Sequence, residues 1–302
     1  MSAVKAHRPS RPSRVRASLL ALVAGISCGH LTDPSLPGNA QLLIPPPVYA
    51  EWWAMVESCS GLSGSLETIQ WYSTTSLLRD PNDNDEAIAG YWSLASNRIV
   101  LYTNDTIAGA IVRHEMLHAL IRSAGHPRWA FLQACGGVVA CLEACVRDAG
   151  PAASPDPGTP TIAPSELEVT SALSPATPSS LLNEGLATFT ISVHNPFSHP
   201  VVVSLPSGSG SVPFSYGYAM RESSGSGMSN GDLALDIGVT YFAAGETKRD
   251  VIDFFVIAPD FPSYQGGPGL GENPIALPVG TYSFQGDYGG KAAPTLSVVL
   301  SQ

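Results

Sequence analysis

The segment VRHEMLHALIRSAGHP, residues 112–127, contains two histidines four positions apart, with a glutamate directly after the first. Residues four apart lie on one face of an α-helix, so His114 and His118 would point the same way. Two neutral imidazoles at this spacing can bind one zinc ion, with Glu115 beside them to accept a proton from water. The segment therefore predicts a helix that carries a zinc site suited to amide hydrolysis.

The residues before this helix predict a mixture of helices and strands. VYAEWWAMVESC, residues 48–59, has apolar side chains at helical spacing. LETIQWYST, residues 66–74, reads as a strand, and IAGYWSLASNRIVLY, residues 88–102, as two strands joined by a turn at Ser96 and Asn97. We therefore expect an α+β fold for this part of the chain.

The motif His114-Glu115-Met116-Leu117-His118 resembles the H-E-x-x-H signature of zincin metallopeptidases, and the resemblance covers residues 48–147. It implies zinc as cofactor, His114 and His118 as ligands, Glu115 as catalytic base and a peptide or protein substrate. In zincins an edge strand before the motif helix pairs with extended substrate, and Arg98 to Tyr102 occupy that place. Two alternatives remain: surface histidines on a structural helix, or a degenerate, non-catalytic metal site.

The third zinc ligand has two candidates. The spacing after His118 departs from the metzincin pattern, but Gly125 can end the helix in a left-handed conformation and turn His126 towards the metal. His126 is the first choice, although it can equally cap the helix end. Gluzincins use a glutamate on a later helix, for which Glu143 is available. No oxyanion-stabilising residue is assigned among the nearby Tyr91, Tyr102 and Arg113.

Residues 1–27 have the layout of a signal peptide, with a basic stretch followed by the apolar run ASLLALVAGIS. The following GISCGH resembles the lipobox of bacterial lipoproteins, which implies lipidation of Cys28 and membrane contact through the lipid anchor alone. Residues 28–47 are rich in proline and predict a flexible spacer. The expected location is outside the cytoplasm, as a membrane-anchored lipoprotein of a bacterial cell envelope, with plain secretion as the alternative.

Export would place the remaining cysteines in an oxidising compartment, where disulfides form. Cys141 and Cys145 lie one helical turn apart, which is a poor geometry for bonding each other inside a regular helix. We therefore expect at least one bridge from Cys135, Cys141 or Cys145 to Cys59, with the connectivity otherwise open. A four-cysteine zinc site is a weaker alternative because the C-x-x-C pairs are missing.

The C-terminal half changes character after a linker rich in Pro, Ala and Ser at residues 148–166. Residues 167–302 consist of short apolar runs separated by turn residues, which predicts an all-β Ig-like sandwich. The arrangement is loosely similar to the intracellular proteinase inhibitor domain of bacilli. That similarity implies a module that covers the catalytic cleft, binds a cell-surface partner or spaces the domains.

Composition removes one class of partner. The chain has 302 residues, only 13% of them charged, and a formal net charge of -10. Such a protein lacks the basic surface needed to bind phosphate backbones, so we expect no nucleic-acid partner. Two functions remain: an exported zinc peptidase, or a non-catalytic surface lipoprotein whose zincin-like domain binds or scaffolds.

Overall fold

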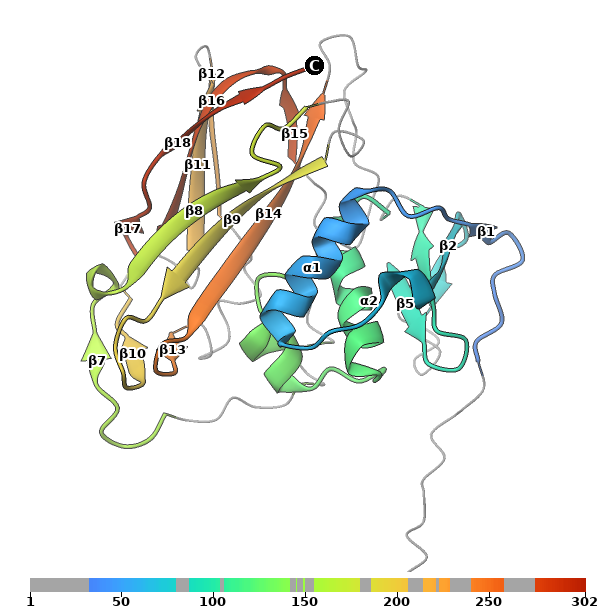
Figure 1. Ribbon diagram of the computed structural model, residues 1–302, viewed down its shortest axis with the longest axis horizontal. Coiled ribbons are helices and arrows are strands. Elements are labelled where there is room, and N and C mark those ends of the chain that lie inside the picture. The colour runs from blue at the N-terminus through green and yellow to red at the C-terminus, as the bar shows by residue number, and fades with distance from the viewer. Residues whose placement is uncertain are drawn as a thin grey trace, which may run out of the picture. The chain divides into compact units, whose positions relative to one another are not determined.

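The computed structural model describes residues 33–79, 87–103, 106–141, 145, 149, 155–179, 186–205, 214–220, 223–228, 240–257 and 275–302. They belong to one compact unit, Asp33–Gln302, which combines helices with several β-sheets in an α+β fold (Figure 1). The predicted signal peptide lies outside the described residues, as do Cys28 and Glu143. Among the described residues, no helix is both long and apolar enough to cross a membrane.

Helix α1, Val48–Ser60, forms where the apolar spacing predicted it. Trp52 and Val56, one turn apart, are fully buried, so the helix packs through one face. The helix ends at Gly61, whose left-handed backbone (φ 69°) lets its N–H bond to Glu57 O. A short 3₁₀ turn, η1 (Leu66–Thr68), then leads into the first sheet.

The sheet of the N-terminal part has the order β1-β2-β6-β5. Its strands are β1 (Gln41–Leu42), β2 (Gln70–Thr74), β5 (Gly90–Ser93) and β6 (Arg98–Tyr102). The predicted hairpin is confirmed: β5 and β6 are antiparallel, and Asn97 in their turn has a φ of 48°. The expected edge strand is wrong, because β6 lies between β2 and β5 and leaves β5 at the edge. Strand β1 also shows that part of the predicted spacer is ordered.

Helix α2, Gly109–Ile121, carries the histidine motif and is buried on nearly all sides. It packs on the sheet face that presents Trp92 and Leu101, and against α1. The residue in left-handed conformation at its end is Arg122 (φ 56°), so the prediction that Gly125 ends the helix is wrong. A six-residue π-helix, η3 (Trp129–Ala134), follows. None of the sequence patterns described above predicts it.

Two disulfides connect the cysteines. Cys59 at the end of α1 bonds Cys135 directly after η3, which confirms the expected bridge to Cys59. Cys141 and Cys145 bond each other, contrary to expectation. The argument against this pair assumed a regular helix, but Cys141 lies outside any helix, so the backbone can bring the two sulfurs together.

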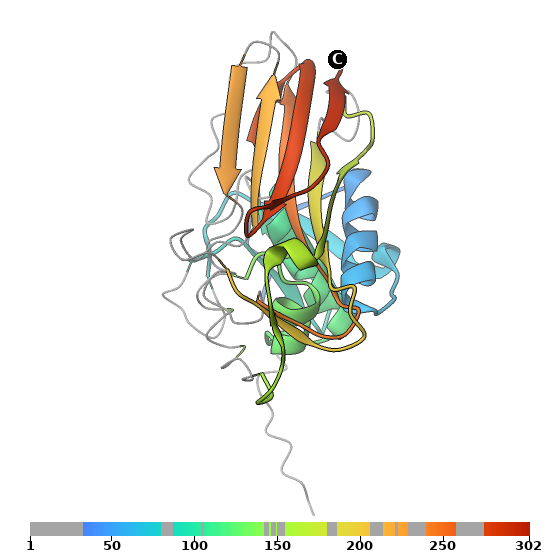
Figure 2. The same cartoon turned by 90° about the vertical axis from the view of Figure 1, so that its left-hand side faces the viewer.

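The C-terminal part is β-rich, as predicted. One sheet has the order β15-β14-β9-β8, a second the order β12-β11-β16-β17 with β18 on β16, and a third the order β13-β10-β7. The strands of the two larger sheets run roughly alongside one another (Figure 2). Their ranges are β7 (Thr161–Ile162), β8 (Glu168–Ser174), β9 (Leu186–His194), β10 (Val201–Val203), β11 (Phe214–Met220), β12 (Ser223–Met228), β13 (Tyr241–Phe242), β14 (Thr247–Ile257), β15 (Ile275–Pro278), β16 (Gly280–Tyr288), β17 (Lys291–Ala292) and β18 (Leu296–Leu300).

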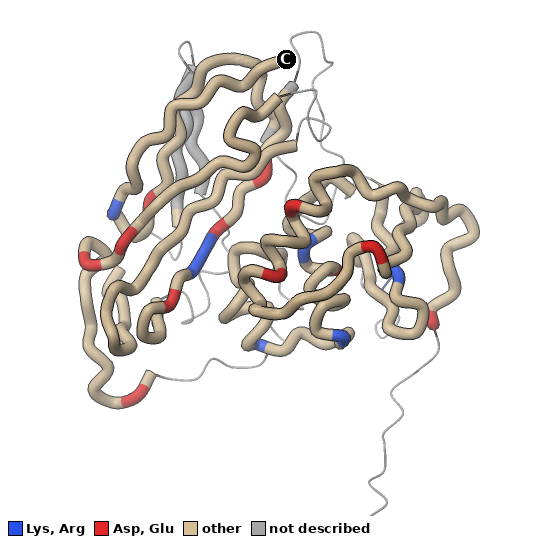
Figure 3. Tube along the Cα trace, viewed as in Figure 1, with Lys and Arg blue, Asp and Glu red and all other residues tan. Residues whose placement is uncertain are grey.

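The two larger sheets meet through aromatic side chains. Phe284 on β16 lies 5.5 Å, between ring centroids, from both Phe189 on β9 and Phe254 on β14. Strand β7 falls inside the predicted linker, where it pairs with β10 before the short turn η4 (Pro164–Glu166). Charged residues are scattered along the described chain (Figure 3).

The two hydrophobic cores are not cleanly divided by sequence. Most of the first core comes from α1, α2, η3 and the N-terminal sheet. It also includes Leu186 from β9 and Val251 from β14, both almost fully buried. Strands of the C-terminal part therefore complete the core that supports the histidine motif.

Candidate metal centre

Three histidine rings meet beside α2. The Nε2 atom of His114 lies 3.1 Å from Nε2 of His118 and 3.2 Å from Nε2 of His126. Nitrogens held about 2.0–2.1 Å from one tetrahedral zinc ion would lie roughly 3.3 Å apart. The separations of His114 Nε2 from His118 Nε2 and from His126 Nε2 are close to this value, so the three rings are compatible with one shared zinc ion. His114 and His118 come from α2, and His126 from the loop between α2 and η3.

Backbone carbonyls orient two of the rings. Nδ1 of His114 lies 2.5 Å from Ala140 O, and Nδ1 of His118 lies 2.7 Å from Ser123 O. A carbonyl oxygen only accepts hydrogen bonds, so each Nδ1 carries the proton and each Nε2 keeps its lone pair. This is the tautomer that a metal ligand needs, fixed by the second hydrogen bond of the ring.

Phe131 of η3 lies against all three rings. Its ring centroid is 4.9 Å from that of His114, 4.8 Å from that of His118 and 4.9 Å from that of His126. The side chain is fully buried, so it cannot move away without leaving a cavity. Sequence reasoning missed Phe131 because nothing in the local pattern indicates which core residue will contact the histidines.

Burial keeps the histidines neutral. Loss of solvent, followed by the neighbouring His126 ring, lowers the pKa of His114 to about 3. Burial also holds the pKa of His118 well below its usual value, with further lowering by His114 and His126. Both rings are therefore uncharged near neutral pH, as ligands to a cation must be.

Glu115 is also part of α2, and its side chain extends towards β5, the edge strand of the N-terminal sheet. Its side chain is 5% exposed, and burial raises its pKa to about 8, against the smaller lowering by a hydrogen bond from the Trp92 backbone. A Cβ added to Gly90 would lie 3.3 Å from Glu115 Cγ and 2.9 Å from Leu101 Cδ2. The glutamate thus packs closely against β5, and its Oε2 has no hydrogen-bond partner among the described residues.

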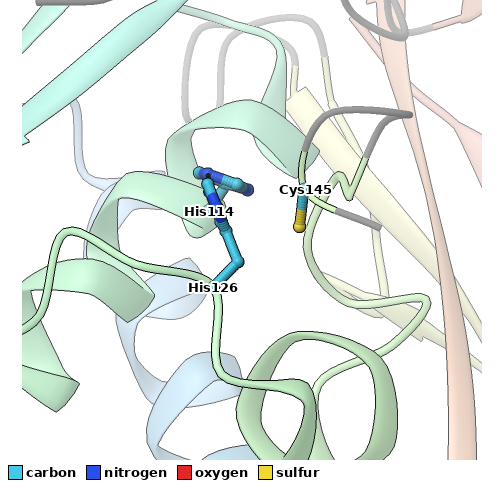
Figure 4. Close-up of side chains that lie close together, drawn as sticks. All are labelled: His114, His126 and Cys145. Carbon is cyan, nitrogen blue, oxygen red and sulfur yellow. Dashed lines mark hydrogen bonds between the residues drawn. The ribbon is translucent and has the colours of Figure 1, made fainter. Parts of the chain in front are cut away.

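Among the described residues, Cys145 is a further side chain of a metal-ligand type close to the histidines. Its Sγ lies within 4.8 Å of the ligand nitrogens of His114 and His126 (Figure 4). Zinc binds the thiolate form of cysteine, and the sulfur of Cys145 is already bonded to Cys141. In this oxidised form three histidines would be the available ligands, and a tetrahedral ion held by them would keep one position for water or substrate.

The side chains considered for oxyanion stabilisation do not face this centre. Arg113 is fully buried in an ion pair. Gly90 and Leu101 face α2, and successive side chains of a strand alternate between faces. Tyr91 and Tyr102, each the next residue along, therefore point to the opposite face of the sheet.

No family model matches the chain, and no curated protein is significantly similar to it. The chemistry of the centre is therefore inferred from its own side chains. Of the residues proposed from sequence, His114, His118 and His126 come together, and Glu115 lies on the same helix. The alternative ligand Glu143 and the lipidation residue Cys28 lie outside the described residues.

Proposed function

We propose that this chain is an exported zinc peptidase in which His114, His118 and His126 hold the metal. The observation that carries the proposal is the convergence of three Nε2 atoms, with separations of 3.1 and 3.2 Å. Histidines that merely occupy a helix surface would not need carbonyl partners at Nδ1 or a shared aromatic neighbour. A zinc ion in this set supplies Lewis acidity and makes water a nucleophile near neutral pH.

Glu115 is the proposed general base. It follows the first ligand on α2, and the Trp92 backbone N–H restrains its carboxylate. Burial raises the pKa of this carboxyl in the absence of metal, and a cation bound beside it would lower the pKa again. The lower pKa favours the ionised form, which takes a proton from the attacking water and returns it to the leaving amine. Both transfers use one side chain, so the reaction needs no second titrating residue.

Strand β5 is the proposed docking edge for substrate. Among the described strands it pairs only with β6, so backbone groups on its other edge, apart from the Trp92 N–H that donates to Glu115, are open to an extended peptide. Its Gly90 and Trp92 lie next to Glu115, which places a peptide bound there beside the base. This role replaces the one that the sequence resemblance gave to residues 98–102.

The remaining assignments follow the same proposal. Residues 48–147 would form a zincin-like catalytic part, and residues 167–302 an Ig-like sandwich that offers a surface for a cell-surface partner. Two disulfides are in keeping with an oxidising compartment, and the proposal therefore includes export, with a signal peptide at residues 1–27 and an anchor at Cys28. The proposal includes no nucleic-acid partner, because the composition is acidic.

The first test is metal content. Purified residues 29–302, reconstituted with zinc and dialysed, should retain about one zinc ion per chain, as expected for a single three-ligand site. Elemental analysis gives the ratio directly. Folded protein without zinc would overturn the proposal.

The second test separates ligand from base. Glu115→Gln should keep zinc but lower hydrolysis of a mixture of unfolded proteins about 100-fold or more, measured as new amino termini. His118→Ala should lose both zinc and hydrolysis, while Glu67→Gln in η1 is the matched control and should change neither. Zinc-loaded wild type that cleaves nothing would favour the non-catalytic scaffold.

A further inference from the structure

Arg113, directly before the first ligand, connects α2 to two other parts of the molecule. Its side chain is fully buried. Nη1 and Nη2 donate to the two carboxylate oxygens of Asp253 on β14, each at 3.0 Å, and Nε donates to Val138 O at 2.5 Å. The planar guanidinium thus fixes three oxygens at once, which a lysine at this position would not do.

The oxygen of Val138 belongs to the segment that orients the first ligand. Two residues later, Ala140 O accepts a hydrogen bond from His114 Nδ1–H, while Ala140 N donates to Ala110 O at 2.9 Å. Arg113 therefore anchors one end of a three-residue stretch whose other end sets the direction of the His114 ring.

Strand β14 touches the same segment along its backbone. Val251 N donates to Gly137 O at 2.8 Å. A Cβ added to Gly137 would lie 2.1 Å from Arg249 O, and its φ of 80° also favours glycine. Residues 137–140 are consequently held between α2 on one side and β14 on the other.

We propose that Asp253 is a positioning residue of the metal centre, acting through Arg113 and residues 138–140 on the ring of His114. The proposal rests on the proposed function, because it assumes that His114 binds metal. It makes strand β14 a structural component of the centre, in addition to the covering, partner-binding or spacing roles expected for an accessory module.

Burying the ion pair of Arg113 and Asp253 costs free energy, so stability alone does not explain why two charges occupy this place in the core. Two buried charges are often no more stabilising than apolar side chains of similar volume. The surroundings are shaped for the pair: a Cβ on Gly109 would lie 2.5 Å from Asp253 Oδ2 and 2.6 Å from Arg113 Nη1. What an apolar pair does not supply is the hydrogen bond that holds Val138 O.

The test replaces both charges together, so that no lone charge is left buried. In residues 29–302, Arg113→Met combined with Asp253→Leu should leave the thermal midpoint close to wild type. Affinity for Zn²⁺ should fall about 10- to 100-fold, in the range found when the partners of metal ligands are removed. Co²⁺ titration adds a spectroscopic readout, because its visible absorption bands change with the orientation of the ligands.

Leu186→Ala provides the matched control. Leu186 is a β9 residue in the same hydrophobic core, and it makes none of these polar contacts. We expect this variant to lower the thermal midpoint while leaving zinc affinity and the Co²⁺ spectrum unchanged. Asp253→Asn keeps one acceptor oxygen, so it should show a smaller loss of affinity in the same direction, and it serves if the double variant does not fold.

Wild-type affinity and spectrum in the folded double variant, or in Asp253→Asn, would overturn the proposal. So would an equal loss of affinity in Leu186→Ala, because the effect would then follow general packing. Wild-type protein that binds neither zinc nor cobalt would instead remove the proposed function itself, and the two failures are thereby distinguished.

Discussion

His126 shows how a single residue decides the character of the centre. The spacing of His114 and His118 guarantees only that two imidazoles share a helix face. The third ring arrives because α2 ends at Ile121 and the chain reverses through Arg122, which brings His126 Nε2 to 3.2 Å from His114 Nε2. Local spacing supplies a pair of ligands, and the turn after the helix supplies the third.

Removing this third ring should release the metal. We expect His126→Ala to weaken zinc affinity by more than about 100-fold, a larger loss than removal of a ligand's supporting partner causes. Glu143→Ala should leave zinc bound. A competition titration with a chelator measures both. Collapse of affinity in Glu143→Ala with unchanged affinity in His126→Ala would reverse the assignment and favour the gluzincin pattern.

At the scale of elements, the Cys59–Cys135 disulfide joins α1 to the end of η3 across a sequence separation of 76 residues. η3 carries Phe131, the residue beneath all three histidine rings. The bridge thus ties the first helix of the core to the element that supports the metal centre.

Replacing both cysteines of this bridge should destabilise the protein without removing a ligand. Closing a loop of this length lowers the entropy of the unfolded chain enough to stabilise the native state by about 4 kcal/mol. Cys59→Ala with Cys135→Ala should lower the thermal midpoint by roughly 10 °C. Cys141→Ala with Cys145→Ala closes a far shorter loop and should lower it less. Equal midpoints for the two variants would contradict this account.

At the scale of the whole molecule, the stability of the helix that carries the histidine motif depends on residues about 70 to 140 positions away in the sequence. Leu186 and Val251 complete the core around α2, and Asp253 neutralises the buried Arg113. Loss of two buried apolar side chains costs about 1.5–3 kcal/mol each, and an unpaired buried charge about 3–5 kcal/mol. The sum is comparable to the stability of a typical domain.

A chain that ends before the first long C-terminal strand should therefore not hold its fold. We expect residues 29–154 to lack the near-ultraviolet circular dichroism of packed aromatic side chains and to show no cooperative thermal transition. Residues 29–302, purified in the same way, are the control. A cooperative transition in the short chain at the temperature of the full chain would show that the N-terminal part is self-sufficient.

Prediction from sequence worked best where the signal is local. The spacing of Trp52 and Val56 predicted α1, and the turn at Ser96 and Asn97 between two short strands predicted the β5–β6 hairpin. The apolar runs predicted most long C-terminal strands. It failed for features that depend on which distant segments of the chain pack or pair with one another. The edge position of β5 and the pairing of Cys141 with Cys145 are such cases.

By itself the sequence determined the helix with His114, Glu115 and His118, because one helical turn brings residues four apart to the same face. Only the tertiary structure decided what surrounds it: Phe131 beneath the rings, Ala140 O on His114 and Asp253 behind Arg113. These contacts join segments distant in sequence, and packing and burial select them only when the cores close. Hydrophobic patterning says which residues are buried, but it does not say which buried residues will touch.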